Sequence, residues 1–209
     1  MDKKYWEEYY STHRQVNEPS LFARFVAENY AGEGEKDLIE LGCGDGRDAI
    51  YFNKQGLNVT AVDQASGQIE YLEDKFKDQS GINFVCGDFT QLGTEHTYDL
   101  VYSRFTLHSI TESEQARVLN WAYNQLNKGG LFCIEVRGKK NELYQKGTQV
   151  AGDPDAYIYD DHYRRFLDFE GLCAQLKGLQ FSVEFAQEAD GFAPFKDTNE
   201  TFIRVVSRK

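Results

Sequence analysis

The chain alternates between short apolar runs and segments whose apolar residues recur at helical spacing. The short runs predict strands at residues 37–41, 58–62, 82–85, 99–103 and 131–136, and near 181–187 and 201–206. The segments between them predict helices at 47–55, at 67–78, from 112 to about 126, and at about 169–177. This alternation is typical of an α/β fold in which helices cover both faces of a mostly parallel sheet.

Capping residues sharpen several of these boundaries. Ser66 is placed to cap the second helix, and Thr111–Glu114 has the capping-box pattern at the start of the third. The run Asn127–Gly130 then ends that helix before the fifth strand. The last two strands are expected to form a hairpin-type end to the sheet.

The length of 209 residues fits a single domain, 1–209. Residues 1–32 precede the first strand and contain two short helical patterns, which we expect to fold over the edge of the sheet as a lid. Residues 138–167 have no regular pattern and are rich in Tyr, Asp and Arg.

A glycine-rich loop, Gly42–Gly46, lies between the first strand and the first helix of the sheet. Glycine allows a tight turn and a close approach of the backbone to a ligand, although a plain turn would need the same residues. Asp63, Asp88 and the segment Ser103–His108 also follow predicted strands. Because ligands of parallel sheets bind beyond the carboxyl ends of the strands, we expect these groups to share one site.

Asp63 ends the second strand, where a carboxylate can accept hydrogen bonds from both hydroxyls of a ribose. Both nicotinamide sites and adenosylmethionine sites use such a residue. The nicotinamide pattern GxGxxG requires a third glycine at position 47, which is Arg47 here. The spacing GxGxG therefore favours an adenosylmethionine site over a nicotinamide oxidoreductase.

Five segments in order resemble the motifs of the class I S-adenosylmethionine-dependent methyltransferases, over roughly residues 37–137. They are Asp37–Gly46, Val62–Gln64, Gly87–Phe89, Tyr98–Ser103 and Leu126–Gly130. The resemblance implies a Rossmann-like three-layer α/β/α sandwich with a seven-stranded sheet whose last strand is antiparallel. It also implies S-adenosyl-L-methionine as the cofactor and S-adenosyl-L-homocysteine as the product.

The resemblance also assigns cofactor contacts by position. Contacts to the methionine portion and ribose fall to Glu40, Gly42, Gly44 and Gly46. Asp63 would hold the ribose hydroxyls, with Gln64 beside the adenine. Asp88 would accept from the adenine amino group and Phe89 would flank the ring, while Ser103 and Arg104 would pass near the sulfonium.

The acceptor side is expected around His108, Arg104 and Arg137, which we assign as catalytic residues. His108 is a candidate base, needed only if the acceptor must lose a proton, or else a packing residue. Recurrent arginines favour an anionic substrate, unless they pair with surface aspartates. The predicted substrate contacts are Tyr9, Tyr10, Arg14, His162, Tyr163, Arg164 and Arg165. Asp160, Asp161 and His162 are too close in sequence to converge on one metal ion, so we predict no metal.

The insertion 138–168 lies where members of the resembled family build a substrate pocket. A narrower resemblance is to small bacterial methyltransferases associated with surface-polysaccharide modification, which implies O-methylation of a sugar, phosphate, carboxylate or related polar group. A non-catalytic cofactor-binding module and a protein methyltransferase remain alternatives.

The formal charge of -11 disfavours nucleic acid and anionic membranes as partners. No apolar run is long enough to cross a bilayer, and the amino terminus lacks the apolar core of a signal peptide. The four cysteines match no zinc or redox spacing, so we expect buried free thiols. Together these features predict a cytoplasmic enzyme of small molecules, with an oligomeric state that the sequence leaves open.

Overall fold

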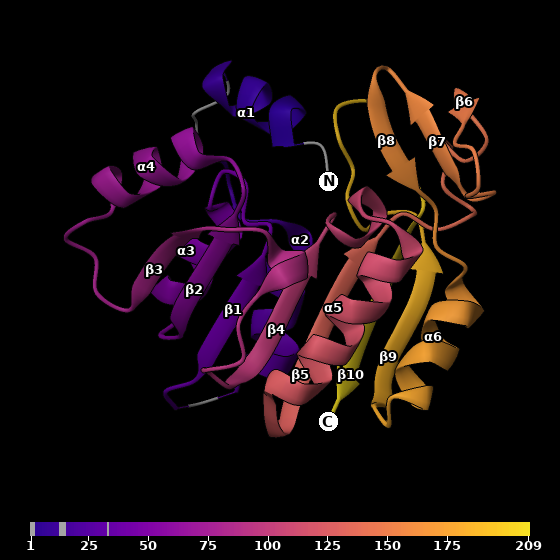
Figure 1. Cartoon of the computed structure of the whole chain (residues 1–209). Coiled ribbons are helices and arrows are strands. Elements are labelled where there is room, and N and C mark those ends of the chain that lie inside the picture. The colour runs from indigo at the N-terminus through magenta and orange to yellow at the C-terminus, as the bar shows by residue number, and fades with distance from the viewer. Residues whose placement is uncertain (1–2, 13–15, 33) are drawn as a thin grey trace.

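The computed structural model describes residues 3–12, 16–32 and 34–209 (Figure 1). A seven-stranded sheet with the order β3-β2-β1-β4-β5-β10-β9 forms its centre. The strands are β1 (Asp37–Leu41), β2 (Asn58–Asp63), β3 (Ile82–Cys86), β4 (Tyr98–Arg104), β5 (Leu126–Val136), β9 (Ser182–Ala189) and β10 (Phe202–Arg208). β10 pairs antiparallel with both β5 and β9, and β1 to β5 run parallel. The predicted sheet, with an antiparallel last strand, is therefore confirmed.

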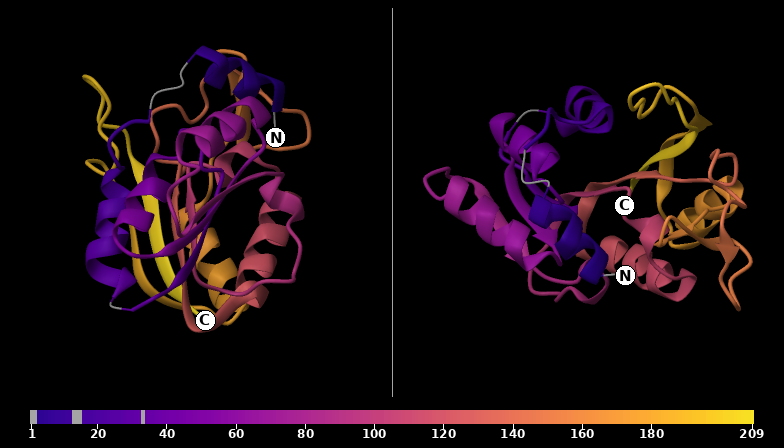
Figure 2. Two further views of the ribbon diagram at one scale, coloured as in Figure 1. Left: turned by 90° about the vertical axis from the view of Figure 1, so that its left-hand side faces the viewer. Right: turned by 90° about the horizontal axis from the view of Figure 1, so that it is seen from above.

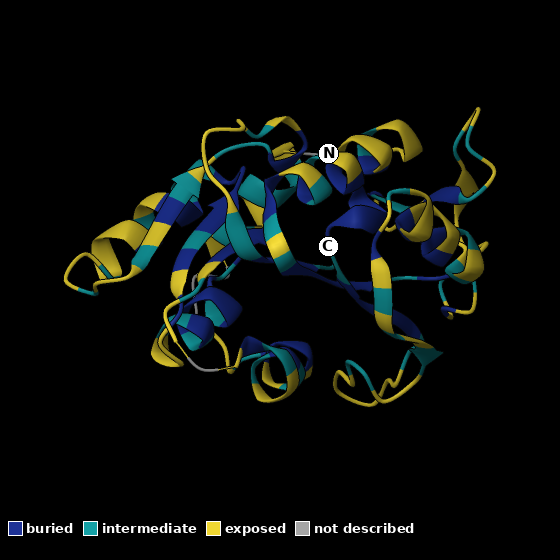
Figure 3. Ribbon diagram, turned by 90° about the horizontal axis from the view of Figure 1, so that it is seen from below, coloured by how far each residue is buried: buried dark blue, intermediate teal, exposed yellow. Residues whose placement is uncertain are grey.

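Helices cover both faces of this sheet. α5 (Glu112–Gln125) and α6 (Phe169–Gly178) pack against one face through a core that includes Val101 and Ile134. α2 (Leu21–Val26), α3 (Arg47–Lys54) and α4 (Ser66–Lys75) pack against the other face. Seen from below in Figure 3, the central strands are largely dark blue and the outer sides of the helices are yellow. The fold is a three-layer α/β/α sandwich.

The two amino-terminal helices have different positions. α1 (Lys3–Thr12) has no buried residue and lies above the end of the sheet, next to α4 and to the hairpin of β7 (Ala156–Tyr159) and β8 (His162–Arg165; Figures 1 and 2). α2 instead buries Phe22, Ala23 and Val26 completely against the sheet, and the short π-helix η1 (Ala27–Ala31) continues it. We expected both helices in a lid, but the apolar face of α2 makes it part of the core.

The capping of α4 differs from the prediction. Ser66 is the first residue of the helix rather than its cap. The carboxylate of Glu7, from α1, accepts hydrogen bonds from the backbone N–H of Ser66 (2.9 Å) and from its hydroxyl (2.9 Å). A carboxylate at a helix amino terminus is favourable, so α1 is anchored to α4 through Glu7. The capping box of Thr111 and Glu114 on α5 is confirmed.

Two other segments also differ from the expected elements. Leu126 and the run Asn127–Gly130 belong to β5, and Leu126 pairs with Tyr98. The segment predicted to be irregular contains a small sheet of β6 (Thr148–Gln149), β7 (Ala156–Tyr159) and β8 (His162–Arg165). Asp160 and Asp161 both have positive φ, 50° and 52°, which is the geometry of a two-residue hairpin turn.

The cysteines carry no disulfide, but one of them is not buried. Cys43, Cys133 and Cys173 are buried, whereas Cys86 at the end of β3 is exposed, contrary to the prediction. Among the helices of the described ranges, none has the length and apolar character that a membrane crossing requires.

Candidate active site

The glycine loop turns its backbone N–H groups inward. Those of Gly42 and Cys43 donate to the carbonyl of Val62 (2.8 and 2.9 Å), and that of Gly46 donates to the carbonyl of Cys43 (2.9 Å). Gly42, Gly44 and Gly46 all have positive φ. A Cβ on Gly42 would overlap Cγ2 of Thr106, and one on Gly44 would overlap the hydroxyl of Tyr10. Because its N–H groups are occupied, the loop is poorly suited to bind a pyrophosphate.

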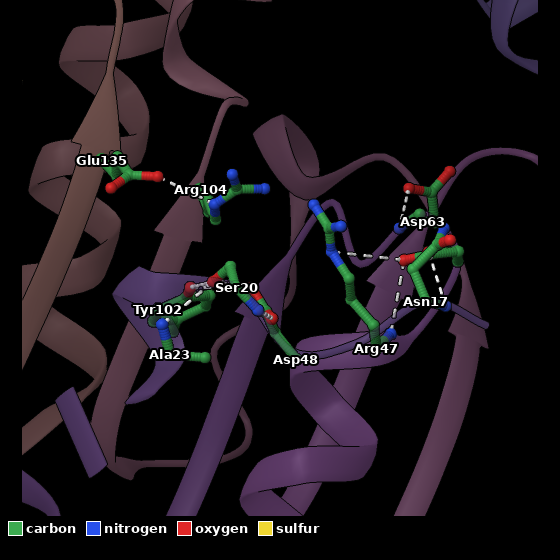
Figure 4. Close-up of polar contacts among 11 residues, drawn as sticks. Asn17, Ser20, Ala23, Arg47, Asp48, Asp63, Tyr102, Arg104 and Glu135 are labelled. Atoms are coloured by element: carbon green, nitrogen blue, oxygen red, sulfur yellow. Dashed lines mark hydrogen bonds and ion pairs between the residues drawn. The ribbon is translucent and has the colours of Figure 1, made fainter. Parts of the chain in front are cut away.

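Asp63 is fixed at the tip of β2 by the same loop. Its Oδ2 accepts the N–H of Gly44 (2.9 Å), and its Oδ1 accepts the N–H of Ala65 (2.9 Å; Figure 4). The residue is 9% exposed, and burial raises the pKa of its carboxyl. Since each carboxylate oxygen can accept a further hydrogen bond, Asp63 is oriented to bind two neighbouring hydroxyls.

Glu40 is the most unusual group of the site. It is 3% exposed, and its Oε2 has no hydrogen-bond partner in the part of the chain that the structure describes. Burial raises the pKa of this carboxyl well above its ordinary value, and the nearby Asp48 and Asp45 raise it further. A buried, unpaired carboxylate is costly, so its presence indicates a cationic or hydrogen-donating ligand.

A cavity of about 180 Å³ connects these groups. The residues around it come from the glycine loop, three strand tips and α1, and they are Trp6, Tyr10, Glu40, Gly42, Cys43, Asp45, Arg47, Asp48, Asp63, Gln64, Phe89, Arg104, Phe105, Thr106 and Ser109. A larger cavity of about 620 Å³ lies along β1, β2 and β3 and includes Asn58, Tyr98 and Trp121. It includes none of the glycine-loop residues, so we place the active site in the smaller cavity.

Comparison with known proteins agrees with this geometry. Residues 38–130 match a family model described as a methyltransferase domain. This segment is therefore similar to a methyltransferase domain, and the chain shares its fold with solved S-adenosylmethionine-dependent methyltransferases. S-adenosylmethionine is the cofactor of these enzymes.

Individual relatives are distant. A malonyl-[acyl-carrier protein] O-methyltransferase of Ilyobacter polytropus is 25% identical over 60% of this chain and 47% of its own length. A second, from Acetivibrio thermocellus, is 37% identical over 49% of this chain and 36% of its own. The chain thus spans half or less of the length of these two relatives.

The fold is also shared with solved structures. The 1,6-didemethyltoxoflavin-N1-methyltransferase of Burkholderia thailandensis, solved with 1,6-didemethyltoxoflavin and S-adenosylhomocysteine, superimposes with a TM-score of 0.72. The two are 20% identical, over 99% of this chain and 86% of the other.

S-adenosylmethionine fits the groups that line this cavity. The unpaired Oε2 of Glu40 and the unpaired Nε2 of Gln64 can bind polar groups of the cofactor, and Asp63 presents two acceptors for the ribose. Phe89 is buried and lies on the cavity wall, as expected for a residue that flanks the adenine. The predicted contacts of Glu40, Gly42, Asp63 and Gln64 thus share one cavity.

Four predicted cofactor contacts lie outside the cavity wall, and they are Gly44, Gly46, Asp88 and Ser103. The hydroxyl of Ser103 is fully buried and hydrogen-bonded to that of Thr106 (2.6 Å). Asp88 accepts from the backbone and hydroxyl of Thr90 (2.9 and 2.8 Å) and from the side chain of Gln91 (3.0 Å). These hydrogen bonds outweigh the opposing effect of burial and lower the pKa of Asp88. Its contact with adenine stays a prediction.

α1 covers the opening of the cavity. Trp6 and Tyr10 line it, and Tyr5 and Trp6 contact the His162 ring of β8 with centroid distances of 4.3 and 5.2 Å. Side chains of two distant segments, α1 and β8, therefore meet beside the cofactor cavity, and of those in contact only His162 was predicted as a substrate residue. Tyr9 is 41% exposed on the outer side of α1, and Arg14 lies outside the described residues.

His108 is buried beside a group of cations. Its Nδ1 accepts the backbone N–H of Arg137 (3.5 Å). Burial lowers the pKa of the imidazole well below its ordinary value, and the charges of Arg137 and Arg164 lower it further. His108 is therefore neutral at pH 7, with its proton on Nε2 because Nδ1 is an acceptor.

The predicted arginines have different partners. Arg137 pairs with Glu200 and donates to Oδ1 of Asn141 (2.9 Å). Arg164 donates to the carbonyl of Tyr159 (2.9 Å) and lies close enough to Arg137 for the two charges to repel. Arg165 is buried and bonds to the carbonyl of Ile110 (3.1 Å), so its contacts are those of a structural clamp.

The other two predicted acceptor residues lie on β8. His162 is buried, and Tyr163 is half-buried, with burial and Asp153 raising its pKa to about 12. Among the described residues, no group of three or more His, Cys, Asp or Glu side chains could hold a metal ion.

One buried hydrogen-bond network next to the cavity was not predicted. Asp48, in the first turn of α3, accepts from the hydroxyls of Ser20 (2.7 Å) and Tyr102 (2.8 Å). Ser20 also caps α2, so the network joins α2, α3 and β4 below the cavity (Figure 4). Asp45 similarly accepts from the side chain of Asn17 (2.6 Å). The feature of the sequence that could have indicated this network is Asp48 itself, an acidic residue six positions after Gly42 in the first turn of the predicted helix.

Proposed function

We propose that the chain transfers the methyl group of S-adenosylmethionine to a small, polar, negatively charged acceptor, most simply as the O-methylation of a carboxylate. The observation that supports this best is the distribution of charge. Four carboxylates line the cofactor cavity together with two arginines, whereas the charged groups that act on the nearby buried His108 are the cations Arg137, Arg164 and Arg165. A cationic cofactor and an anionic acceptor match these two regions.

The acceptor region has two cations. Arg137 packs against Phe202, with its guanidinium carbon 5.0 Å from the ring centroid, and is partly neutralised by Glu200. Arg164 is bonded only to backbone carbonyls among the described residues, so its charge is not offset by a direct ion pair. An anionic group can bind there by charge-assisted hydrogen bonds.

The chemistry requires alignment more than proton transfer. When bound, S-adenosylmethionine supplies a methyl group on a sulfur that is already activated as a leaving group. A carboxylate or phosphate oxygen carries no proton that must be removed, so no base is needed. Trp6 and Tyr10 exclude water, and the arginines orient the acceptor. The relatives named as malonyl-[acyl-carrier protein] O-methyltransferases are consistent with an oxygen acceptor.

The acceptor can be tested directly. We expect the purified protein to transfer a labelled methyl group to carboxylates or sugar phosphates in a metabolite extract. Arg164→Met should raise the KM for the identified acceptor about tenfold, because a charge-assisted hydrogen bond is lost. Arg117→Met, on an exposed arginine of α5, is the matched control and should change nothing. Labelling confined to protein or nucleic acid would contradict the proposal.

The role of His108 is a separate prediction. With Nδ1 bonded to the Arg137 backbone, Nε2 is a hydrogen-bond donor for the acceptor. His108→Gln retains a donor near that position and should keep kcat within about threefold, whereas His108→Ala should lose about tenfold. The wild-type kcat/KM should show no acidic limb from this residue between pH 6 and 8, because its pKa lies well below 6.5. If both variants lose activity, and the kcat/KM of the wild type falls towards acidic pH between pH 8 and pH 6, then His108 acts as a base.

A further inference from the structure

A buried row of three charges crosses the sheet behind the cavity. Glu135 in β5 is 0% exposed and lies in register between Arg104 of β4 and Arg204 of β10. One carboxylate oxygen accepts Nε of Arg104 (2.8 Å), and the other accepts Nε of Arg204 (2.5 Å). One carboxylate is thus shared by two guanidinium groups, which leaves a net positive charge in the row.

The far end of the row is immobilised. Arg204 donates to the carbonyl of Phe192 (2.8 Å), and its guanidinium carbon lies 4.3 Å from the Phe192 ring centroid and 5.1 Å from that of Phe22. It is also 6% exposed. The guanidinium of Arg204 is held by contacts within the protein, so Arg204 fixes Glu135 and does not itself bind a ligand.

The near end of the row faces the cavity. The backbone N–H of Phe105 donates to the carbonyl of Glu135 (2.8 Å), and Phe105 adopts a φ of 60°, which is uncommon outside glycine. The Phe105 ring lies 4.0 Å from the guanidinium carbon of Arg104. Backbone and ring together hold the Arg104 side chain in one orientation.

Arg104 has unused donors. In the described part of the chain only its Nε makes a hydrogen bond, although a guanidinium has five donors. The terminal nitrogens point away from Glu135, towards Arg47 and Asp63 (Figure 4). The same cavity contains Glu40, whose Oε2 is unpaired and whose carboxyl feels the charge of Arg104, so a guanidinium with unused donors and a carboxylate with an unused acceptor line one cavity.

We propose that Arg104 binds the α-carboxylate of the cofactor's amino-acid end, and that Glu135 and Arg204 are positioning residues that aim it there. The proposal rests on the proposed function, because it assumes an adenosylmethionine cofactor whose ribose binds Asp63. From that anchor the zwitterionic end extends to the pair of Arg104 and Glu40, which complements an α-carboxylate and an α-ammonium.

Arg47 is the rival cation. It also lines the cavity, but its Nε lies 3.8 Å from Oδ1 of Asp45 and its side chain is 30% exposed, against 14% for Arg104. Its charge is therefore offset and more screened by solvent.

Two ligands separate these roles by calorimetry. S-adenosylhomocysteine carries the amino-acid end, whereas 5′-methylthioadenosine keeps the adenosine and the thioether but lacks that end. We expect Arg104→Met to weaken S-adenosylhomocysteine binding about tenfold and to leave methylthioadenosine binding within twofold. Glu135→Gln should weaken S-adenosylhomocysteine binding about threefold to fivefold, again selectively, because Arg104 is then less firmly held. Arg47→Met should have little effect on the ratio of the affinities for the two ligands.

A matched control is Glu184→Gln, which breaks the pair of Glu184 with Arg208 (2.9 Å) between β9 and β10. It should change neither affinity. The proposal is overturned if Arg104→Met weakens the binding of both ligands equally. It is also overturned if Arg47→Met, rather than Arg104→Met, selectively weakens S-adenosylhomocysteine binding. If Glu135→Gln does not fold, judged by its unfolding midpoint, Arg104→Met and Arg104→Gln decide the question. Wild-type protein that binds neither ligand would refute the proposed function itself, whereas wild-type binding without selectivity in the variants refutes only the role of Arg104.

Discussion

Replacing Asp63 with Asn is expected to weaken S-adenosylhomocysteine binding by about 100-fold or more. Each carboxylate oxygen already accepts one backbone N–H, from Gly44 and from Ala65. An Asn amide must turn its NH₂ towards one of these two donors, so one hydrogen bond becomes a repulsion. The substitution also removes the charge that strengthens two ribose hydrogen bonds, each worth roughly 1.5–3 kcal/mol.

The measurement is the dissociation constant from calorimetry at constant salt. Asp74→Asn is the control, because Asp74 is an exposed carboxylate of α4 that does not line the cavity. We expect this substitution to weaken S-adenosylhomocysteine binding by no more than a few-fold. An Asp63→Asn protein that binds within threefold of wild type would show that the ribose lies elsewhere.

The contrast between Asp63 and Asp88 shows what the sequence can predict. Both were placed at the correct edge of the sheet, because parallel strands bring their carboxyl ends to one edge regardless of the details of packing. Their contacts were not predictable. Asp88 bonds to Thr90 and Gln91, which follow it immediately, and such local hydrogen bonds compete with ligand contacts in a way that spacing alone does not reveal.

Cross-strand contacts were missed for a different reason. Arg104 and Arg204 meet Glu135 because the register sets them side by side, and a shift of one residue would turn each of them to the opposite face. The predicted strand ends were uncertain by more than that. The Glu7 cap on α4 depends similarly on the placement of α1, and the pattern of α4 contains no sign of it.

The fold itself was accessible because it depends on repeated patterns. Five apolar runs and the helical segments between them give the layers, and the capping box at Thr111 fixes the start of α5. α2 was misplaced because six residues, Leu21–Val26, are too few to show whether an apolar face meets the core or a ligand.

Glu40→Gln is expected to change stability and binding in opposite directions. In the free protein the ionised carboxylate is buried, unpaired at Oε2 and close to Asp48 and Asp45, so its pKa lies well above the usual value. Ionisation of such a group opposes folding, because the unfolded chain ionises it more easily. Gln keeps the volume and removes the charge, so the free variant should be more stable at pH 8 than wild type.

The pH dependence tests the sign of this effect. A carboxyl whose pKa is raised by folding costs nothing at low pH, where it is protonated in both states, and costs stability as the pH rises through the folded pKa. The gain from Glu40→Gln should therefore be largest above the raised pKa, shrink as the pH falls towards the ordinary value of 4.5, and vanish below that value. Thermal unfolding of both proteins from pH 5 to pH 8 measures this difference.

Cofactor binding should respond oppositely. The carboxylate that destabilises the free protein is the group that pairs with the α-ammonium of the cofactor, so Glu40→Gln should weaken S-adenosylhomocysteine binding by about 10- to 100-fold. Methylthioadenosine, which has no ammonium group, should be affected far less. A variant that loses stability at pH 8, or that binds both ligands as wild type does, would show that Glu40 is a structural acid and not a binding group. The expected combination instead identifies a carboxylate retained for its ligand at a cost to the free fold.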